Sequence, residues 1–286
     1  MNTILVTGIS EPAGRNLSMM LSERHYRVIG TDSQFVSIKG IAHYQVPDVR
    51  DPMLMATYLG IVHKEKVNLI IPTVEELSVF SNGWQWIDQY PILSPSWKAV
   101  EIANDKYLTA QVLLEKKVSI PHFILPSQVN SPEQVAQKIG WPCIGKLRVG
   151  DVKNSIQKYS VDDWPLVATL SDAYFLQEFI PGLDLLPTLF MGKNKETVVI
   201  VLEKSEFNEN NDENFKPIKR IVAPDIANLA TKTAQAIGIC GPIAMKIRRR
   251  SNGTPVVLDV NAHFWANIRF APEVLDAALK AAFPSY

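Results

Sequence analysis

The chain has 286 residues, of which 47% are hydrophobic and 20% are charged. That composition is typical of a globular protein, and the length leaves room for a sizeable core and two or three domains. Lysine and arginine together number 29, as do aspartate and glutamate, so the sequence has no basic excess. A neutral balance argues against nucleic acid or an anionic membrane surface as a partner and favours small molecules.

The cysteines and the N-terminus bear on the compartment. Cys143 and Cys240 lie far apart in apolar stretches, which predicts two buried thiols in a reducing environment. The first residues show no basic start followed by an apolar stretch of signal-peptide length, and no segment reaches the roughly 18 apolar residues of a membrane span. We therefore expect a cytoplasmic protein without a membrane partner.

The first third of the chain alternates strand and helix patterns. Residues 3–7 are a short apolar run followed by Gly8, which is typical of a parallel strand buried on both faces. Three further strands are predicted at 26–32, 44–46 and 68–73. This alternation predicts a Rossmann-like parallel sheet with right-handed crossovers over residues 1–95.

The rest of the chain has a different pattern. A single helix is predicted from 97 to 117, before the proline at 121. Strands are predicted at 142–146, 173–179, 185–191 and 197–203. The acidic, asparagine-rich stretch 206–215 predicts an exposed loop, and an amphipathic helix is expected to end at Gly238.

A β-hairpin is predicted near the C-terminus, from residues 243–249 and 255–261. Asn252-Gly253 lies between them and is the preferred pair for a two-residue type I′ turn. With that turn, Lys246 lies opposite Asp259, and Ala244 lies opposite Asn261. Asp259 and Asn261 are two residues apart on one strand and therefore point to the same face.

Five segments resemble the ATP-grasp superfamily, in particular its carbamoyl-phosphate-synthase-like and carboxylate–amine ligase members. They are residues 71–76, 104–106, 141–146, 175–184 and 258–261. Each alone has an ordinary structural interpretation, but their order and spacing match the family over nearly the whole chain. The resemblance implies an α/β and α+β fold: a Rossmann-like parallel sheet (1–95), a linker with the first lobe of an ATP clamp (96–182), and a second lobe with a metal-site hairpin (183–286).

The same resemblance implies roles for individual residues. Lys106 and Lys146 would contact nucleotide phosphates; Glu178, Phe179 and Ile180 would form the hinge around adenine; Asp184 would hold the ribose; Asp259 and Asn261 would bind Mg²⁺. A lysine that ends an apolar strand needs a partner or a ligand, so Lys146 is the least easily explained as purely structural. Together these groups make a coherent site for ATP and Mg²⁺.

Two parts of the family pattern are altered. The family covers the phosphates with a glycine-rich loop, whereas residues 147–156 keep only Gly150. Arg148 and Ser155, with Lys153 between them, are hypothesised to replace the lost backbone donors with side-chain donors.

The expected metal site is also altered. Lys246 stands where the family places a carboxylate or glutamine, so its ammonium would compete with Mg²⁺ for Asp259. His263 stands near where an arginine usually steadies the substrate or the transferred phosphate. Lys246 and His263 are therefore the candidate catalytic positions.

Three functions follow from these patterns. The first is an ATP-dependent carboxylate–amine ligase that acts through an acylphosphate on small-molecule carboxylate and amine substrates; a homodimer is compatible with it. The second is an ATP- or ADP-binding protein of the same fold with weak catalysis and a regulatory or scaffold role. The third is an NAD(P)-dependent reductase or epimerase, suggested by residues 7–14 and by Asp32, although Ser10 and Ala13 stand where a dinucleotide loop needs glycine.

Overall fold

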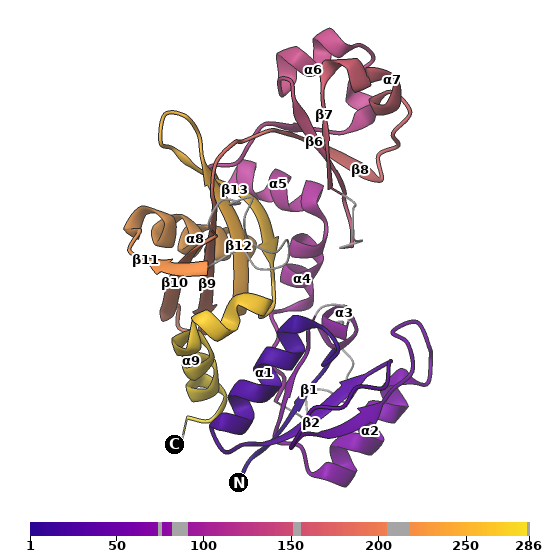
Figure 1. Ribbon diagram of the computed structural model, residues 1–286, viewed down its shortest axis with the longest axis vertical. Coiled ribbons are helices and arrows are strands. Elements are labelled where there is room, and N and C mark those ends of the chain that lie inside the picture. The colour runs from indigo at the N-terminus through magenta and orange to yellow at the C-terminus, as the bar shows by residue number, and fades with distance from the viewer. Residues whose placement is uncertain (74–75, 82–90, 151–155, 205–217, 285–286) are drawn as a thin grey trace, which may run out of the picture.

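The computed structural model describes residues 1–73, 76–81, 91–150, 156–204 and 218–284. Its strands form three sheets (Figure 1), of four, four and five strands in chain order. Strands 185–191 and 197–203, the strand ending at Lys146 and the helix ending at Gly238 are confirmed within a residue or two. The stretch 206–215 lies outside the described residues. In the described part of the chain, no helix is both long and apolar enough to cross a membrane.

The first sheet is parallel throughout, as predicted. Its strands are β1 (Thr3–Val6), β2 (Arg27–Asp32), β3 (Ala42–Gln45) and β4 (Leu69–Ile71), in the order β3-β2-β1-β4. The helices are α1 (Pro12–Glu23), α2 (Leu54–Glu65) and the short α3 (Glu76–Ser81). Ile4 and Val6 share a core with Leu17 of α1, whereas Leu5 shares one with Tyr58 of α2. Because successive strand residues point to opposite faces, α1 and α2 cover opposite sides of the sheet.

Two glycines allow α1 to begin directly against the end of β1. Gly8 has a φ of +60°, a conformation that glycine adopts without cost. A Cβ on Gly14, in the first turn of α1, would lie 2.4 Å from the Gly8 carbonyl oxygen. The glycines of residues 7–14 therefore serve close packing between loop and helix.

Gly14→Ala is expected to lower the free energy of unfolding by about 1–3 kcal/mol, because the new methyl group meets backbone that cannot yield. Gly60→Ala, within α2, is the matched control. A Cβ there meets nothing within 4 Å, and we expect a gain of up to about 1 kcal/mol. Urea unfolding of both variants checks this; equal stabilities would show that the loop rearranges freely.

The second sheet is antiparallel and has its own small core. Its strands are β5 (Phe123–Ile124), β6 (Cys143–Leu147), β7 (Ile156–Tyr159) and β8 (Tyr174–Glu178), in the order β5-β8-β6-β7. The short helices are η2 (Pro126–Gln128), α6 (Pro132–Lys138), η3 (Val161–Asp163) and α7 (Trp164–Val167). Val135, Cys143 and Leu176 are buried among them. In Figure 1 this unit stands at the top, apart from the parallel sheet.

The third sheet is a five-stranded antiparallel layer. Its strands are β9 (Asp184–Met191), β10 (Thr197–Lys204), β11 (Ile218–Ile221), β12 (Gly241–Arg249) and β13 (Pro255–Asn261), in the order β11-β10-β9-β12-β13. Leu185 and Ile243 pack on α8 (Pro224–Ile237). Phe190 shares a core with α9 (Pro272–Ala282), η4 (Ala266–Phe270) and α1. The third sheet is thereby fixed to the N-terminal unit.

The single helix predicted over 97–117 is wrong, since the chain forms two helices there. They are α4 (Trp97–Asn104) and α5 (Lys106–Glu115), separated at Asp105, whose backbone is extended. The Asp105 carboxylate accepts hydrogen bonds from the amides of Tyr107 and Leu108, so it caps a new helix. This break places Lys106 in the first turn of α5.

The predicted hairpin register is confirmed for the pairs Lys246–Asp259 and Ala244–Asn261, although the predicted turn is wrong. The loop holds three residues rather than two: the Arg250 amide bonds the Thr254 carbonyl, and Gly253 has a φ of +84°. A bulge then leaves Leu258 without an opposite residue, because Lys246 pairs with Asp259 and Ile247 with Val257. The extra loop residue and the bulge offset each other, so Ala244 still pairs with Asn261.

One smaller expectation is also corrected. Cys143 is buried as predicted, but Cys240 is exposed. It lies in the connection between Gly238, which ends α8, and the first residue of β12, where the neighbouring Ile239 is buried and Cys240 is not.

Candidate functional site

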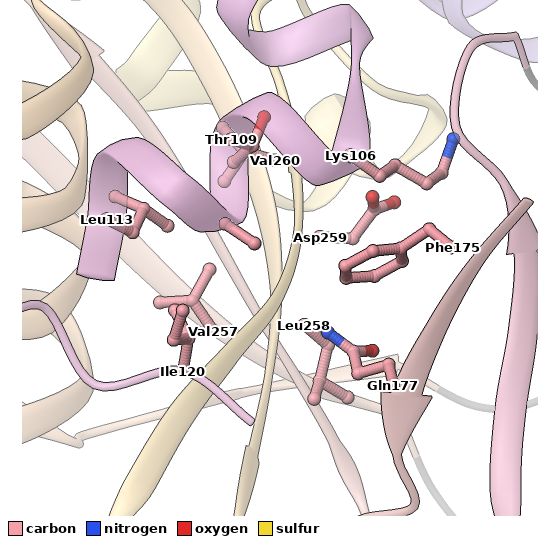
Figure 2. A pocket seen from close by; sticks show the side chains of 11 residues that line it. Lys106, Thr109, Leu113, Ile120, Phe175, Gln177, Val257, Leu258, Asp259 and Val260 are labelled. Carbon is pink, nitrogen blue, oxygen red and sulfur yellow. The ribbon is translucent and has the colours of Figure 1, made fainter. Parts of the chain in front are cut away.

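Lys106, Lys146 and Asp259 come from three different elements and meet in one place. Lys106 and Asp259 line a pocket between α5, β8 and β13, together with Phe175 and Gln177 (Figure 2). Lys146 of β6 is hydrogen-bonded to the walls of the same pocket. The two lobes therefore close around a shared cleft.

Lys146 is a buried ammonium group with neutral partners. Its side chain is 6% exposed, and Nζ donates to Gln177 Oε1 at 2.9 Å and to the Leu258 carbonyl at 3.0 Å. The bulge at Leu258 explains the second bond, because an unpaired strand residue has a carbonyl to spare. Lys146 thus joins the first lobe to the hairpin.

The electrostatic environment of Lys146 disfavours its charge. Burial lowers its pKa to about 8; Asp259 opposes this shift, and the nearby cations Lys246, Lys106 and Arg248 each add a smaller lowering effect. An ammonium held in this way gains from any anion that enters the cleft. The site is therefore prepared for a negatively charged ligand.

Lys106 is held at the mouth of the cleft by the first turn of α5. Its amide donates to the Arg148 carbonyl at 2.9 Å, and its Nζ donates to the Gly150 carbonyl at 3.0 Å. Both contacts are with the segment that follows β6. These two bonds fix Lys106 to the segment after β6, and its ammonium remains exposed to a ligand.

Arg148 has a structural partner. Its Nη2 lies 2.6 Å from Asp105 Oδ2, and its guanidinium lies over the Tyr107 ring. Partial burial alone would raise the pKa of Asp105, but the bonds from Arg148 and from the Leu108 and Tyr107 amides keep it below its usual range. Whether Arg148 also reaches a phosphate stays a prediction, and Ser155 and Lys153 lie outside the described residues.

The hinge residues are tied to β12 and its following loop by two arginines. Arg248 Nε donates to Asp184 Oδ1 at 2.6 Å, and its Nη1 donates to the Ile180 carbonyl at 2.7 Å. Arg250 pairs with Glu178 and also bonds the Ile120 carbonyl. Phe179 lies between Glu178 and Ile180 in the sequence, and the ammonium of Lys158 lies over its ring.

Sequence reasoning missed Gln177, Arg248, Arg250 and the Leu258 carbonyl. A signal for the arginines exists, since Lys246, Arg248 and Arg250 alternate along one strand and its end, and so share a face. Nothing local to Gln177 or Leu258 indicates a partner across the cleft.

The donors around Asp259 do not fit a protein-bound Mg²⁺. Asp259 and Asn261 offer one carboxylate and one amide, and Lys246 is their neighbour on β12. Among the described residues, no group of three or more histidine, cysteine, aspartate or glutamate side chains gathers as a metal cage would. Lys246 lies 3.8 Å from Asp184 rather than forming the expected pair with Asp259. His263 Nδ1 lies 2.7 Å from the Phe264 carbonyl.

Asp32, the residue expected to bind ribose in the NAD(P) hypothesis, has a different use in the structure. Asp32 is buried, and its two carboxylate oxygens accept hydrogen bonds from the amides of Ser10 and Gln34. A carboxylate used in this way closes the loop after β1 and is not presented to a ribose. The bonds to Asp32 fix the loop after β1 to the end of β2.

The parallel sheet and the two antiparallel sheets, with the lysine-lined cleft between the latter two, form the ATP-grasp fold that the sequence resemblance implied. No protein-family model matches the chain, and no curated protein resembles its sequence closely enough to count as a match.

Solved structures show the same fold. N5-carboxyaminoimidazole ribonucleotide synthetase from Thermotoga maritima is 17% identical, with a TM-score of 0.69 over 99% of this chain and 76% of that one. N5-carboxyaminoimidazole synthetase from Staphylococcus aureus, solved with ADP, is 15% identical, with a TM-score of 0.73 over 98% and 77%. L-amino acid ligase from Bacillus licheniformis is 15% identical, with a TM-score of 0.73 over 98% and 74%.

Proposed function

We propose that the cleft binds ATP and that the chain is an ATP-dependent ligase that joins a carboxylate to an amine. The convergence of Lys106 and Lys146 on the pocket lined by Asp259 supports this most strongly. Among the described residues, the hydrogen bonds of both ammonium groups go to neutral oxygens, and one of the two groups is buried. Such an arrangement is costly unless an anion binds between them, and a triphosphate is an anion of suitable charge.

The similar structures support the same choice of nucleotide and reaction. The Staphylococcus aureus synthetase was solved with ADP, and the Bacillus licheniformis protein is an amino acid ligase. The likeness extends over 98% of this chain, which supports the use of the same fold for the same class of reaction. The identity of 15% leaves the substrates of this chain to be found by experiment.

The proposed reaction has two steps. A carboxylate oxygen attacks the γ-phosphorus of ATP, and the bond from that phosphorus to the β,γ-bridging oxygen breaks. ADP departs, and an acylphosphate remains. An amine nitrogen then attacks the acyl carbon, phosphate leaves, and the amine proton passes to solvent. Lys106 and Lys146 would neutralise charge on the phosphates. A role for His263 at the transferred phosphate rests on its place in the sequence alone.

A second candidate is a nucleotide-binding protein with little turnover. The observation that favours it is the register of Lys246 with Asp259, the expected Mg²⁺ ligand. An ammonium there opposes the metal that phosphoryl transfer uses, while Lys106 and Lys146 are still placed to bind phosphates. A regulatory or scaffold role would need binding alone.

Two measurements separate these functions. Protection from thermal unfolding by ATP and ADP, but not by NAD(H), is expected for either candidate; protection by NAD(H) alone would exclude both. Phosphate release from ATP is then screened against pairs of carboxylates and amines. Release that depends on both substrates supports the ligase, and binding without release under every condition supports the second candidate.

A further inference from the structure

The face of the third sheet that looks into the cleft carries opposed charges on three neighbouring strands. Arg248 of β12 lies opposite Asp184 of β9, as their 2.6 Å contact shows. Two residues earlier, Lys246 lies opposite Asp259 of β13 and diagonal to Asp184. Lys246 is therefore placed between two carboxylates from different strands, in the middle of the face.

This position is the one where a dication would need its ligands. Mg²⁺ usually takes one or two carboxylates from the protein and completes its shell with phosphate oxygens and water, so Asp259 and Asn261 would be its ligands from this chain. The neighbouring residue in register with Asp259 is Lys246, an ammonium that has donors and no acceptor. The protein's own cation therefore stands in the place of the metal.

The balance of charge around the cleft points the same way. Lys106, Lys246 and Arg248 all lie close enough to Lys146 to disfavour its charge, whereas Asp259 favours it and Asp184 contacts Lys246 and Arg248. Among these six side chains, four cations against two carboxylates leave an excess of two positive charges. A site with that excess attracts a bare polyphosphate more strongly than one already neutralised by a metal.

We infer that the cleft binds its nucleotide as the metal-free polyanion, with Lys246, supported by Arg248, supplying the positive charge that a divalent cation would otherwise bring. The inference rests on the proposed nucleotide site but not on the ligase reaction. Coordination of Mg²⁺ removes two negative charges from ATP and brings a dication beside Lys246. Both effects oppose binding of the magnesium complex.

The test is calorimetric titration of the β,γ-imido analogue of ATP into the wild-type protein, at matched ionic strength, in EDTA and in excess Mg²⁺. We expect binding in EDTA to be at least about tenfold tighter. Tighter binding in Mg²⁺ would overturn the inference and leave the nucleotide site intact. Absence of binding under both conditions would instead remove the proposed function.

Charge reversal at Lys246 provides the second arm. Lys246→Glu places a carboxylate in register with Asp259, and we expect it to bind the analogue more tightly in Mg²⁺ than in EDTA. Lys193→Glu is the matched control: Lys193 is exposed and follows the far end of β9, so it changes the net charge equally and should keep the wild-type preference. A wild-type preference in Lys246→Glu would also count against the inference. If Lys246→Glu does not fold, Lys246→Gln takes its place in the test. Lys246→Gln adds no negative charge, and we expect it to bind the analogue equally well in EDTA and in Mg²⁺.

Discussion

Replacement of Lys146 by methionine is expected to weaken ATP binding by about tenfold to 100-fold. Methionine keeps much of the length and apolar stem of lysine and removes its charge. A charge-assisted hydrogen bond to a phosphate oxygen contributes about 1.5–3 kcal/mol, and Lys146 is the buried ammonium at the junction of the two lobes. Calorimetric titration of ATP into the variant measures the loss directly.

Lys138→Met is the control for this prediction. Lys138 lies on α6 of the same lobe, is exposed, and its Nζ donates to the Gln128 carbonyl away from the cleft. The two variants make the same chemical change, so a general effect of lost charge should appear in both. Full ATP affinity in a folded Lys146→Met protein, checked by circular dichroism, would mean that Lys146 is only a brace between the lobes.

The fold was predictable because local patterns and long-range packing agree in most of the chain. The apolar run at residues 3–7 is typical of a buried strand and forms one, and the helix that ends at Gly238 carries its own stop signal. The exceptions have identifiable causes. Asp105 lies inside a helical pattern, but its carboxylate competes for the amides of the next turn and begins a second helix.

Site residues that belong to a single sequence motif could be predicted from the sequence. Contacts that depend on how two strands pair could not. Lys106, Lys146 and Asp259 were identified from motifs, and they do meet. The pairing of Arg248 with Asp184 requires the register between β12 and β9, which nothing in the sequence specifies. The register of β13 was right because a bulge offset an unpredicted loop residue.

The same bulge links fold to site. Without it, the carbonyl of Leu258 would belong to the strand ladder, and of its two hydrogen-bond acceptors in the described residues Lys146 would keep Gln177 alone. A buried ammonium with a single neutral acceptor is poorly satisfied. The bulge therefore does two things at once: it sets Asp259 opposite Lys246 and it holds Lys146 in the cleft.

ATP affinity is expected to fall as pH rises above about 8, by up to tenfold per pH unit. The pKa of Lys146 is lowered to about 8 by burial and by Lys246, Lys106 and Arg248, with Asp259 opposing them. Bound phosphate favours the ammonium form, so above that pH the protein must take up a proton to bind ATP. Titrations from pH 7 to pH 9.5 measure the slope, and a flat profile would contradict the prediction.

The free energy of unfolding of the nucleotide-free protein should rise between about pH 8 and pH 10.5, whereas ATP affinity falls as pH rises above 8. The pKa of Lys146 in the folded chain, about 8, is below its ordinary value of 10.5, so between these two pH values the unfolded chain binds more protons. The contribution of this residue to the free energy of unfolding therefore rises with pH in that window, and is lowest below pH 8, where the buried charge is present in full. Lys146→Met removes the titrating group. Its ATP affinity should be weaker and less dependent on pH, and urea unfolding should lose the same component of its pH dependence; if both slopes persist in the variant, another group is responsible for them.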